Sequence, residues 1–168
     1  MKIRGFDDGK ISDSVVNAVR IFGAINHDNE EYGYFTIREG RTGEIFLVRN
    51  ISVLLDGKAE KNFLLSLERS YRLFKNKNDE SSWQSLNHDA SVPGQPENSR
   101  PWGHSAGAIR CNNLIFSFSG TSSDLGDEAV MLFSSVQLGW LLLNQARGVA
   151  GLSQNHYFED MIHSGINV

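Results

Sequence analysis

The chain has 168 residues, of which 40% are hydrophobic and 21% are charged, and this composition excludes a fibrous or wholly disordered protein. The formal net charge of -4 disfavours a general nucleic-acid binder, because such binding requires clustered lysine and arginine. The single cysteine, Cys111, excludes an intramolecular disulfide. We therefore expect one folded domain over residues 1–168.

The first predicted elements are a helix and a β-hairpin. Apolar residues recur at helical spacing over residues 12–25, and Ser12 is the predicted N-cap. The segments YGYFTIRE and EIFLVRN flank the turn-forming GRTG and are rich in aromatic and β-branched residues. Helix is therefore expected to give way to antiparallel sheet.

A second amphipathic helix is predicted over residues 58–77. Glu68 and Arg72 lie four residues apart and are expected to pair on its outer side. Between Lys58 and Lys77 six basic residues outnumber two acidic ones, and a solvated helix face explains them better than a phosphate-binding patch. The residues predicted to face the core are Phe63, Leu64, Leu67, Tyr71 and Phe74.

A long loop and a second hairpin are expected next. Residues 77–105 contain all three prolines and show little periodicity, and loops of this length are typically functional or bound to a partner. Asn112 and Asn113 separate two alternating runs, and asparagine tolerates the positive φ that a two-residue hairpin turn requires.

One long helix is predicted over about residues 125–147, with Asp124 as its N-cap and Arg147 and Gly148 as its stop signals. Its large apolar residues cover nearly the whole circumference, so it must be buried on all sides. A subunit interface would cover the second side and predicts a homo-oligomer. A C-terminal helical extension over residues 153–168 is the alternative cover.

The N-terminus and the most apolar run of the chain indicate its expected location in the cell. MKIRGFDDGK lacks the apolar region of a signal peptide, and the run over residues 129–143 is too short and too polar to cross a membrane. The sequence therefore predicts a cytoplasmic protein with no membrane partner.

The order of these elements, with SFSGTSSDLGDEAVM as the best local match, resembles the GlcG/HbpS-like family. The resemblance implies an α+β domain with a central antiparallel β-sheet flanked by helices, in a GlcG/HbpS-like or profilin-like three-layer arrangement. It also implies homo-oligomers and, as in some members, binding of haem or a related small molecule. It implies no catalytic residue. The residues that stand at the family's positions are Ser119, Gly120, Asp127, Glu128 and Ala129.

Two stretches are candidate ligand sites. His104, beside Trp102 in the glycine-containing RPWGHSAG, is the preferred axial ligand for haem, and an ordinary loop histidine is the alternative. The elbow Ser119, Gly120 and Thr121 precedes a helix whose free N–H groups would suit a carboxylate or a haem propionate. Simple capping of that helix by Ser123 and Asp124 is the alternative.

No motif identifies a catalytic residue. The five histidines lack a recognised metal-ligand spacing, and no Gly-x-Ser-x-Gly elbow is present. Cys111, beside Arg110, is predicted to be either a reactive thiol or a buried inert one. The leading function is a small-molecule-binding protein with haem as a candidate ligand, and the alternative is a protein-interaction or structural module that uses the aromatic loop 83–104.

Overall fold

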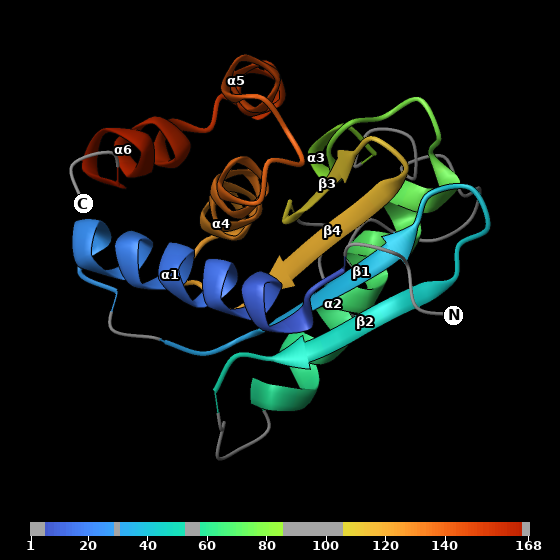
Figure 1. Ribbon diagram of the computed structural model, residues 1–168, viewed down its shortest axis with the longest axis horizontal. Helices are drawn as coiled ribbons and strands as arrows, with labels where there is room; N and C mark the ends of the chain where they lie inside the picture. Colours follow the sequence, from blue (N-terminus) through green and yellow to red (C-terminus); the bar gives the residue numbers. More distant parts are fainter. Residues whose placement is uncertain (1–5, 29–30, 53–57, 86–105, 166–168) are drawn as a thin grey trace, which may run out of the picture.

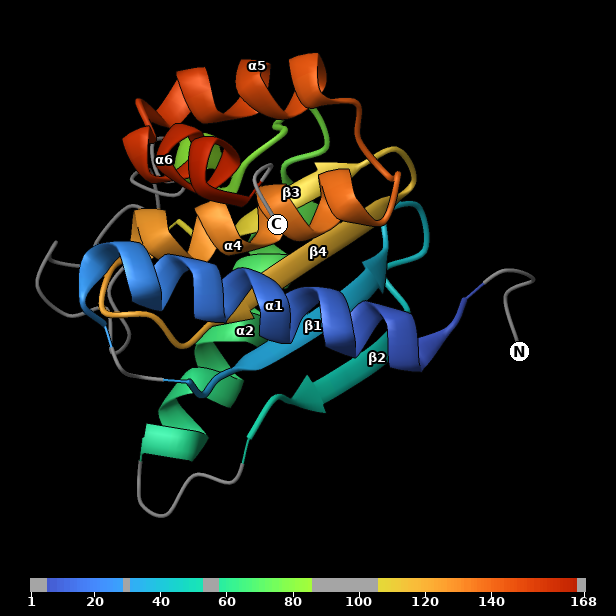
Figure 2. The same ribbon diagram turned by 60° about the vertical axis from the view of Figure 1, so that its left-hand side comes forward.

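The protein forms a four-stranded antiparallel sheet with helices on both faces, as the computed structural model shows over residues 6–28, 31–52, 58–85 and 106–165. The strand order is β2-β1-β4-β3. Figures 1 and 2 show α1 and α4 over one face and α2 over the other, which confirms the predicted single-domain α+β fold. The elements are α1 (Asp8–Asn26), β1 (Tyr34–Glu39), β2 (Ile45–Asn50), α2 (Lys58–Lys75), α3 (Ser82–Ser85), β3 (Ala108–Cys111), β4 (Leu114–Ser119), α4 (Asp124–Gln137), α5 (Leu143–Ser153) and α6 (His156–Gly165).

The two faces of the sheet differ in polarity. Strand residues alternate between faces, so each strand contributes one set of side chains to each helical layer. The apolar set lies in the main hydrophobic cluster with α1, α4 and α6, and the opposite set meets α2. The apolar set includes Phe35, Ile37, Phe116 and Phe118, all fully buried, and the polar set includes Thr36, Arg38, Ser117 and Ser119.

Helix α1 begins earlier than predicted. Its N-cap is Asp7, whose carboxylate accepts hydrogen bonds from the backbone N–H groups of Gly9 and Lys10. The predicted cap, Ser12, lies inside the helix, because aspartate at the true start satisfies the free N–H groups first. The buried face contains Ile11, Val15, Val19 and Phe22, as the spacing predicts.

Both predicted hairpins form, and Glu39 joins their turns. Its carboxylate accepts hydrogen bonds from the backbone N–H groups of Arg41 and Thr42 in the β1–β2 turn. It also accepts one from the side-chain amide of Asn113 in the β3–β4 turn. The pKa of Glu39 is lowered, chiefly by its hydrogen bonds to Thr42 and with a smaller effect from Asn113.

We expect Glu39→Gln to reduce the pH dependence of stability in acid. A carboxyl group with a lowered folded-state pKa stabilises the fold above its unfolded pKa of about 4.3, and this contribution is lost as the pH falls through the folded pKa. The urea midpoint should therefore fall less between neutral and acid pH in the variant than in the unmodified protein. An equal fall in both proteins would show that ionisation of Glu39 does not contribute to the pH dependence of stability.

The helix predicted over residues 125–147 is wrong as a single element. Helix α4 ends at Gln137, and α5 begins at Leu143 and continues to Ser153, so Arg147 and Gly148 lie inside α5. Gly139 adopts a φ of 70°, a conformation that glycine takes without strain, and it breaks the apolar run. Of the two predicted capping residues, Ser123 and Asp124, the N-cap is Ser123, whose hydroxyl accepts a hydrogen bond from the N–H of Gly126.

The second side of α4 is covered within the chain. Helix α4 contacts α1, α5 and α6 as well as β3 and β4. The predicted C-terminal helix exists as α6, and its buried Phe158, Met161 and Ile162 belong to the main hydrophobic cluster. The apolar surface of α4 thus needs no second subunit, and a homo-oligomer stays a prediction for sedimentation analysis. None of the helices in the described ranges is long and apolar enough to span a membrane.

Candidate functional site

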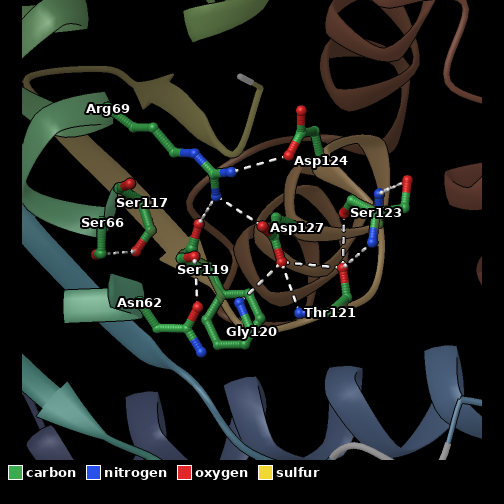
Figure 3. Close-up of polar contacts among 12 residues, drawn as sticks. Asn62, Ser66, Arg69, Ser117, Ser119, Gly120, Thr121, Ser123, Asp124 and Asp127 are labelled. Atoms are coloured by element: carbon green, nitrogen blue, oxygen red, sulfur yellow. Dashed lines mark hydrogen bonds and ion pairs between the residues drawn. The ribbon is translucent and has the colours of Figure 1, made fainter. Parts of the chain in front are cut away.

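The elbow after β4 wraps around the carboxylate of Asp127. The backbone N–H groups of Gly120 and Thr121 donate to Asp127 Oδ1 at 3.0 and 2.8 Å, and the Thr121 hydroxyl donates to the same oxygen at 2.9 Å (Figure 3). Ser122 N donates to Asp28 Oδ2 at 3.0 Å. The donors predicted to hold an external anion therefore already hold the chain's own carboxylates, and a ligand at the elbow would have to displace Asp127.

Arg69 completes this buried cluster from α2. Its side chain is 2% exposed and donates from Nη1 to Asp127 Oδ2 and to the carbonyl oxygen of Phe118, each at 2.6 Å (Figure 3). Its Nη2 lies 3.1 Å from Asp124 Oδ1, whose side chain is 53% exposed. Burial raises the pKa of Asp127, and the charge and hydrogen bonds of Arg69 act in the opposite direction. The cluster ties α2 to β4 and α4.

Gly107 makes room for this guanidinium. Its φ of +126° is a conformation that side-chain-bearing residues rarely adopt, and a Cβ there would lie 2.5 Å from Arg69 Nη1. The sequence showed no sign of this requirement, because residues 69 and 107 meet only in the folded chain.

A second buried carboxylate, Glu128, is held by neutral donors. The hydroxyl groups of Ser81 and Ser153 donate to it, and Asn155 Nδ2 donates to Oε1 at 3.1 Å. Burial raises the pKa of Glu128, and these hydrogen bonds lower it in part. Because Glu128 is fully buried, we interpret the cluster as a structural link between α4, the segment before α3 and the α5–α6 junction.

The candidate haem ligands lie mostly outside the described residues. Trp102 and His104 fall there, so their predicted role is not tested. The described histidines, His27, His156 and His163, are all exposed. The part of the chain that the structure describes contains no group of three side chains suited to a metal ion. Haem binding stays a prediction, to be tested by a saturable Soret shift on titration with haemin.

Cys111 was predicted to be either a reactive thiol or a buried inert one, and the structure shows a buried thiol. It is 1% exposed on β3, and its sulfur lies 3.2 Å from the Ser135 hydroxyl. Burial raises the pKa of the Cys111 thiol to about 12, so almost no thiolate exists near neutral pH.

We expect Cys111 to resist a disulfide reagent such as dithionitrobenzoate in the native protein and to react stoichiometrically in urea. The absorbance of the released thiolate measures both reactions. Rapid labelling under native conditions would show that β3 opens readily or that the thiol is accessible.

An open cleft of about 410 Å³ lies between the β3–β4 turn and α5. Arg110 lines it, but its guanidinium is already bonded to the chain: Nε donates to the carbonyl oxygen of Asp79 at 3.0 Å and Nη2 to that of Leu73 at 2.7 Å. Glu80 is the other charged residue of the lining. Asn112 and Gln145 in the lining also bond to the chain, through Nδ2 and Oε1, so the cleft offers few free polar groups to fix a small ligand.

Helix α2 meets the sheet through its polar side. The hydroxyl groups of Ser66 and Thr36 lie 2.7 Å apart, and Arg38 Nε donates to Ser70 Oγ at 3.3 Å. Near the N-terminal end of the helix, Ser119 Oγ donates to Asn62 Oδ1 at 3.2 Å (Figure 3). Hydrogen bonds thus fill much of the layer where an apolar contact is usual, beside a small apolar cluster of Leu73, Ala108 and Ile115.

The predicted orientation of α2 is therefore wrong. Arg72, expected on the outer side, is 3% exposed, and it pairs with the partly exposed Glu68 at 3.1 Å. Arg69 is likewise buried, so the two arginines are not part of a solvated face. Tyr71, predicted to face the core, is 51% exposed. Helix α2 directs Ser66 and Ser70 toward the sheet because the strand residues that they meet, Thr36 and Arg38, are polar.

This orientation leaves an apolar surface beside α2, which we call the α2–β2 surface. Ile45 and Val48 pair with Arg38 and Thr36, whose side chains reach α2, so all four lie on the same face of the sheet. Helix α2 contacts β1, β3 and β4, and its apolar flank lies over the β1–β2 side of the sheet, since Phe63 packs on Tyr34 of β1 and Phe74 lies against Gly43 in the β1–β2 turn. The surface consists of Ile45, Val48, Phe63, Leu67, Tyr71 and Phe74, all partly or largely exposed.

Most of the α2–β2 surface lies outside the hydrophobic core. Ile45, Val48, Phe63, Leu67 and Tyr71 are absent from both clusters of buried apolar residues that the described chain forms, and their neighbour Phe74 packs against the smaller one. Ile45 and Tyr71 are 42% and 51% exposed. Contiguous exposed apolar side chains of this kind are typical of interaction sites.

Comparison with known proteins gives no family. No family model, curated protein or solved structure matches the chain. The resemblance to GlcG/HbpS-like proteins therefore stays a prediction, and the functional argument depends on the geometry of the α2–β2 surface.

Proposed function

We propose that this protein is a protein-interaction module that binds its partner through the α2–β2 surface. The observation that carries the proposal is the orientation of α2, which buries Arg69 and Ser66 and leaves Leu67 and Tyr71 at the surface. Placing polar groups inside and apolar groups outside costs stability in a monomer, because the apolar side chains stay in water. A partner that covers them offsets this cost.

The composition of the surface supports a protein partner. Aromatic side chains supply much of the binding energy at protein interfaces, and Phe63, Tyr71 and Phe74 are three in a short span. By contrast, the polar groups of the elbow are already bonded to one another, which weakens the case for a small anion there.

The α2–β2 surface is a different contact from the one that the sequence predicted, which was the aromatic loop 83–104. Trp83, at the start of the aromatic loop 83–104, is 37% exposed on α3. Residues 86–104 of that loop lie outside the described ranges, so their part in binding stays a prediction.

Site-specific photo-crosslinking tests the proposal. A benzophenone side chain placed at Leu64, on the rim of the α2–β2 surface, should form an adduct with a second protein in the cells that produce this chain. The same group at the exposed Asp160 on α6, on the opposite side of the sheet, is the matched control and should not form that adduct. Leu67→Glu should abolish the adduct without lowering the unfolding temperature.

Absence of an adduct at position 64, or an identical adduct at position 160, would contradict the proposal. Retention of the adduct in a folded Leu67→Glu variant would also contradict it.

A further inference from the structure

We infer that the partner of the α2–β2 surface presents an acidic segment, with a carboxylate seated beside Tyr71 and apolar side chains on Leu67 and Ile45. This inference rests on the proposed function and adds the chemistry of the partner. It is argued from the cations that surround Tyr71.

Two cations lie close to the ring of Tyr71. Arg38 Cζ is 5.7 Å from the centre of its ring, and Lys75 Nζ is 5.9 Å from it. Each position lies within the range in which a cation is attracted to an aromatic face. The Tyr71 end of the surface is therefore positively charged as well as apolar.

These cations have no carboxylate partner among the described residues. Arg38 donates to the Ser70 hydroxyl and, at 2.7 Å, to the carbonyl oxygen of Gly43, and both acceptors are neutral. Lys75 and the exposed Arg41 of the β1–β2 turn form no ion pair with a described residue. Burial lowers the pKa of Arg38, and the electrostatic effect of Tyr71 acts in the opposite direction.

The nearby acids offset this charge only in part. Glu39 bonds to the two hairpin turns, and Glu68 pairs with Arg72. Glu44, next to Ile45, is the exposed acid of the β1–β2 turn, and Glu60 lies near the opposite end of α2. Arg38, Arg41 and Lys75 therefore face Glu39 and Glu44, which leaves a local excess of one positive charge in a chain whose formal net charge is -4.

A carboxylate on the partner would supply the missing counter-charge at the apolar surface. Complementary charges at an interface accelerate association and fix the register of the partner, and the effect weakens as salt screens it. Lys75 and Arg41 are exposed and can meet the carboxylate directly, while Arg38 contributes its charge from beneath Tyr71.

The experiment measures the yield of the Leu64 crosslink in lysate at low and high ionic strength for charge and apolar variants. The double variant Arg41→Glu/Lys75→Glu should lower the yield roughly tenfold at low ionic strength and less at high ionic strength, as expected for rim charges. Lys10→Glu, an exposed charge reversal on α1, is the matched control and should leave the yield unchanged. Mass spectrometry of the adduct should identify a crosslinked segment that is rich in Asp or Glu.

The failures of the two proposals are distinguishable. If Leu67→Glu abolishes the adduct but Arg41→Glu/Lys75→Glu does not lower it, the acidic-segment inference is overturned and the interaction module stands. A crosslinked segment without acidic residues, or one that belongs to a second copy of this chain, also overturns the inference. If neither variant lowers the yield, both proposals are wrong.

Discussion

Arg69→Met is expected to lower the free energy of unfolding by about 3–5 kcal/mol, because it leaves the buried carboxylate of Asp127 without its cation. The loss is large since Asp127 is only 4% exposed and water cannot replace the guanidinium. Urea denaturation at neutral pH, followed by tryptophan fluorescence, measures the change.

Two further variants distinguish the contribution of the buried Arg69–Asp127 pair to stability from that of the exposed contact with Asp124. Asp124→Asn should cost less than about 1 kcal/mol, because that carboxylate is half exposed and already solvated. Arg69→Met/Asp127→Leu should recover part of the loss, since removing both charges leaves no unpaired ion in the interior. If Arg69→Met alone changes the stability by less than about 1 kcal/mol, the ion pair does not hold α2 to α4.

Phe116→Ala is expected to cost about 3–5 kcal/mol of stability, the range for truncating a buried aromatic side chain. Phe116 is fully buried, and its ring makes edge-on contacts with Phe35 at 5.9 Å and Trp140 at 5.2 Å between centroids. Its removal opens a cavity that two rigid rings cannot readily fill.

Tyr71→Ala is the matched aromatic control. Tyr71 is half exposed and lies outside both hydrophobic clusters, so its truncation should change stability by less than about 1 kcal/mol. The same variant should weaken the Leu64 crosslink. Chemical denaturation of the two variants thus separates an aromatic residue that holds the fold from one that we assign to the interface. A loss for Tyr71→Ala equal to that for Phe116→Ala would place Tyr71 in the core.

The attachment of α2 connects stability with the proposed function. One face of the sheet is covered through apolar contacts of Phe35, Phe116 and Phe118, and the other through hydroxyl groups, Arg38 and the Arg69 ion pair. Hydrogen bonds and ion pairs have strict geometry, whereas apolar contacts are non-directional. The polar layer therefore holds α2 in one orientation, and that orientation brings the apolar flank to the surface.

Local chemistry was sufficient to predict much of the fold. Alternation and the turn residues GRTG and Asn112-Asn113 predicted both hairpins, and helical spacing predicted α1, α2 and the C-terminal α6. These patterns are readable because turn formation and amphipathic period depend on neighbours in the sequence. The elbow was also predicted as a helix start, although its N–H groups proved to be bonded to Asp127 and Asp28.

Apolar spacing and turn residues predicted most of the helices and strands but not the break between α4 and α5, and the buried side of α2 was set by contacts that form in the folded chain. Tyr71 and Phe74 predicted an inward apolar face, but Ser66 of α2 meets the hydroxyl of Thr36 and donates to the carbonyl oxygen of Ser117 in the strands beneath it. Asp127 lies 58 residues from Arg69 in the chain and captures its guanidinium in the interior. Helical periodicity records only that a helix has two unlike faces. The choice between them depends on residues distant in sequence, and here that choice places the apolar flank of α2 at the surface, over the β1–β2 side of the sheet.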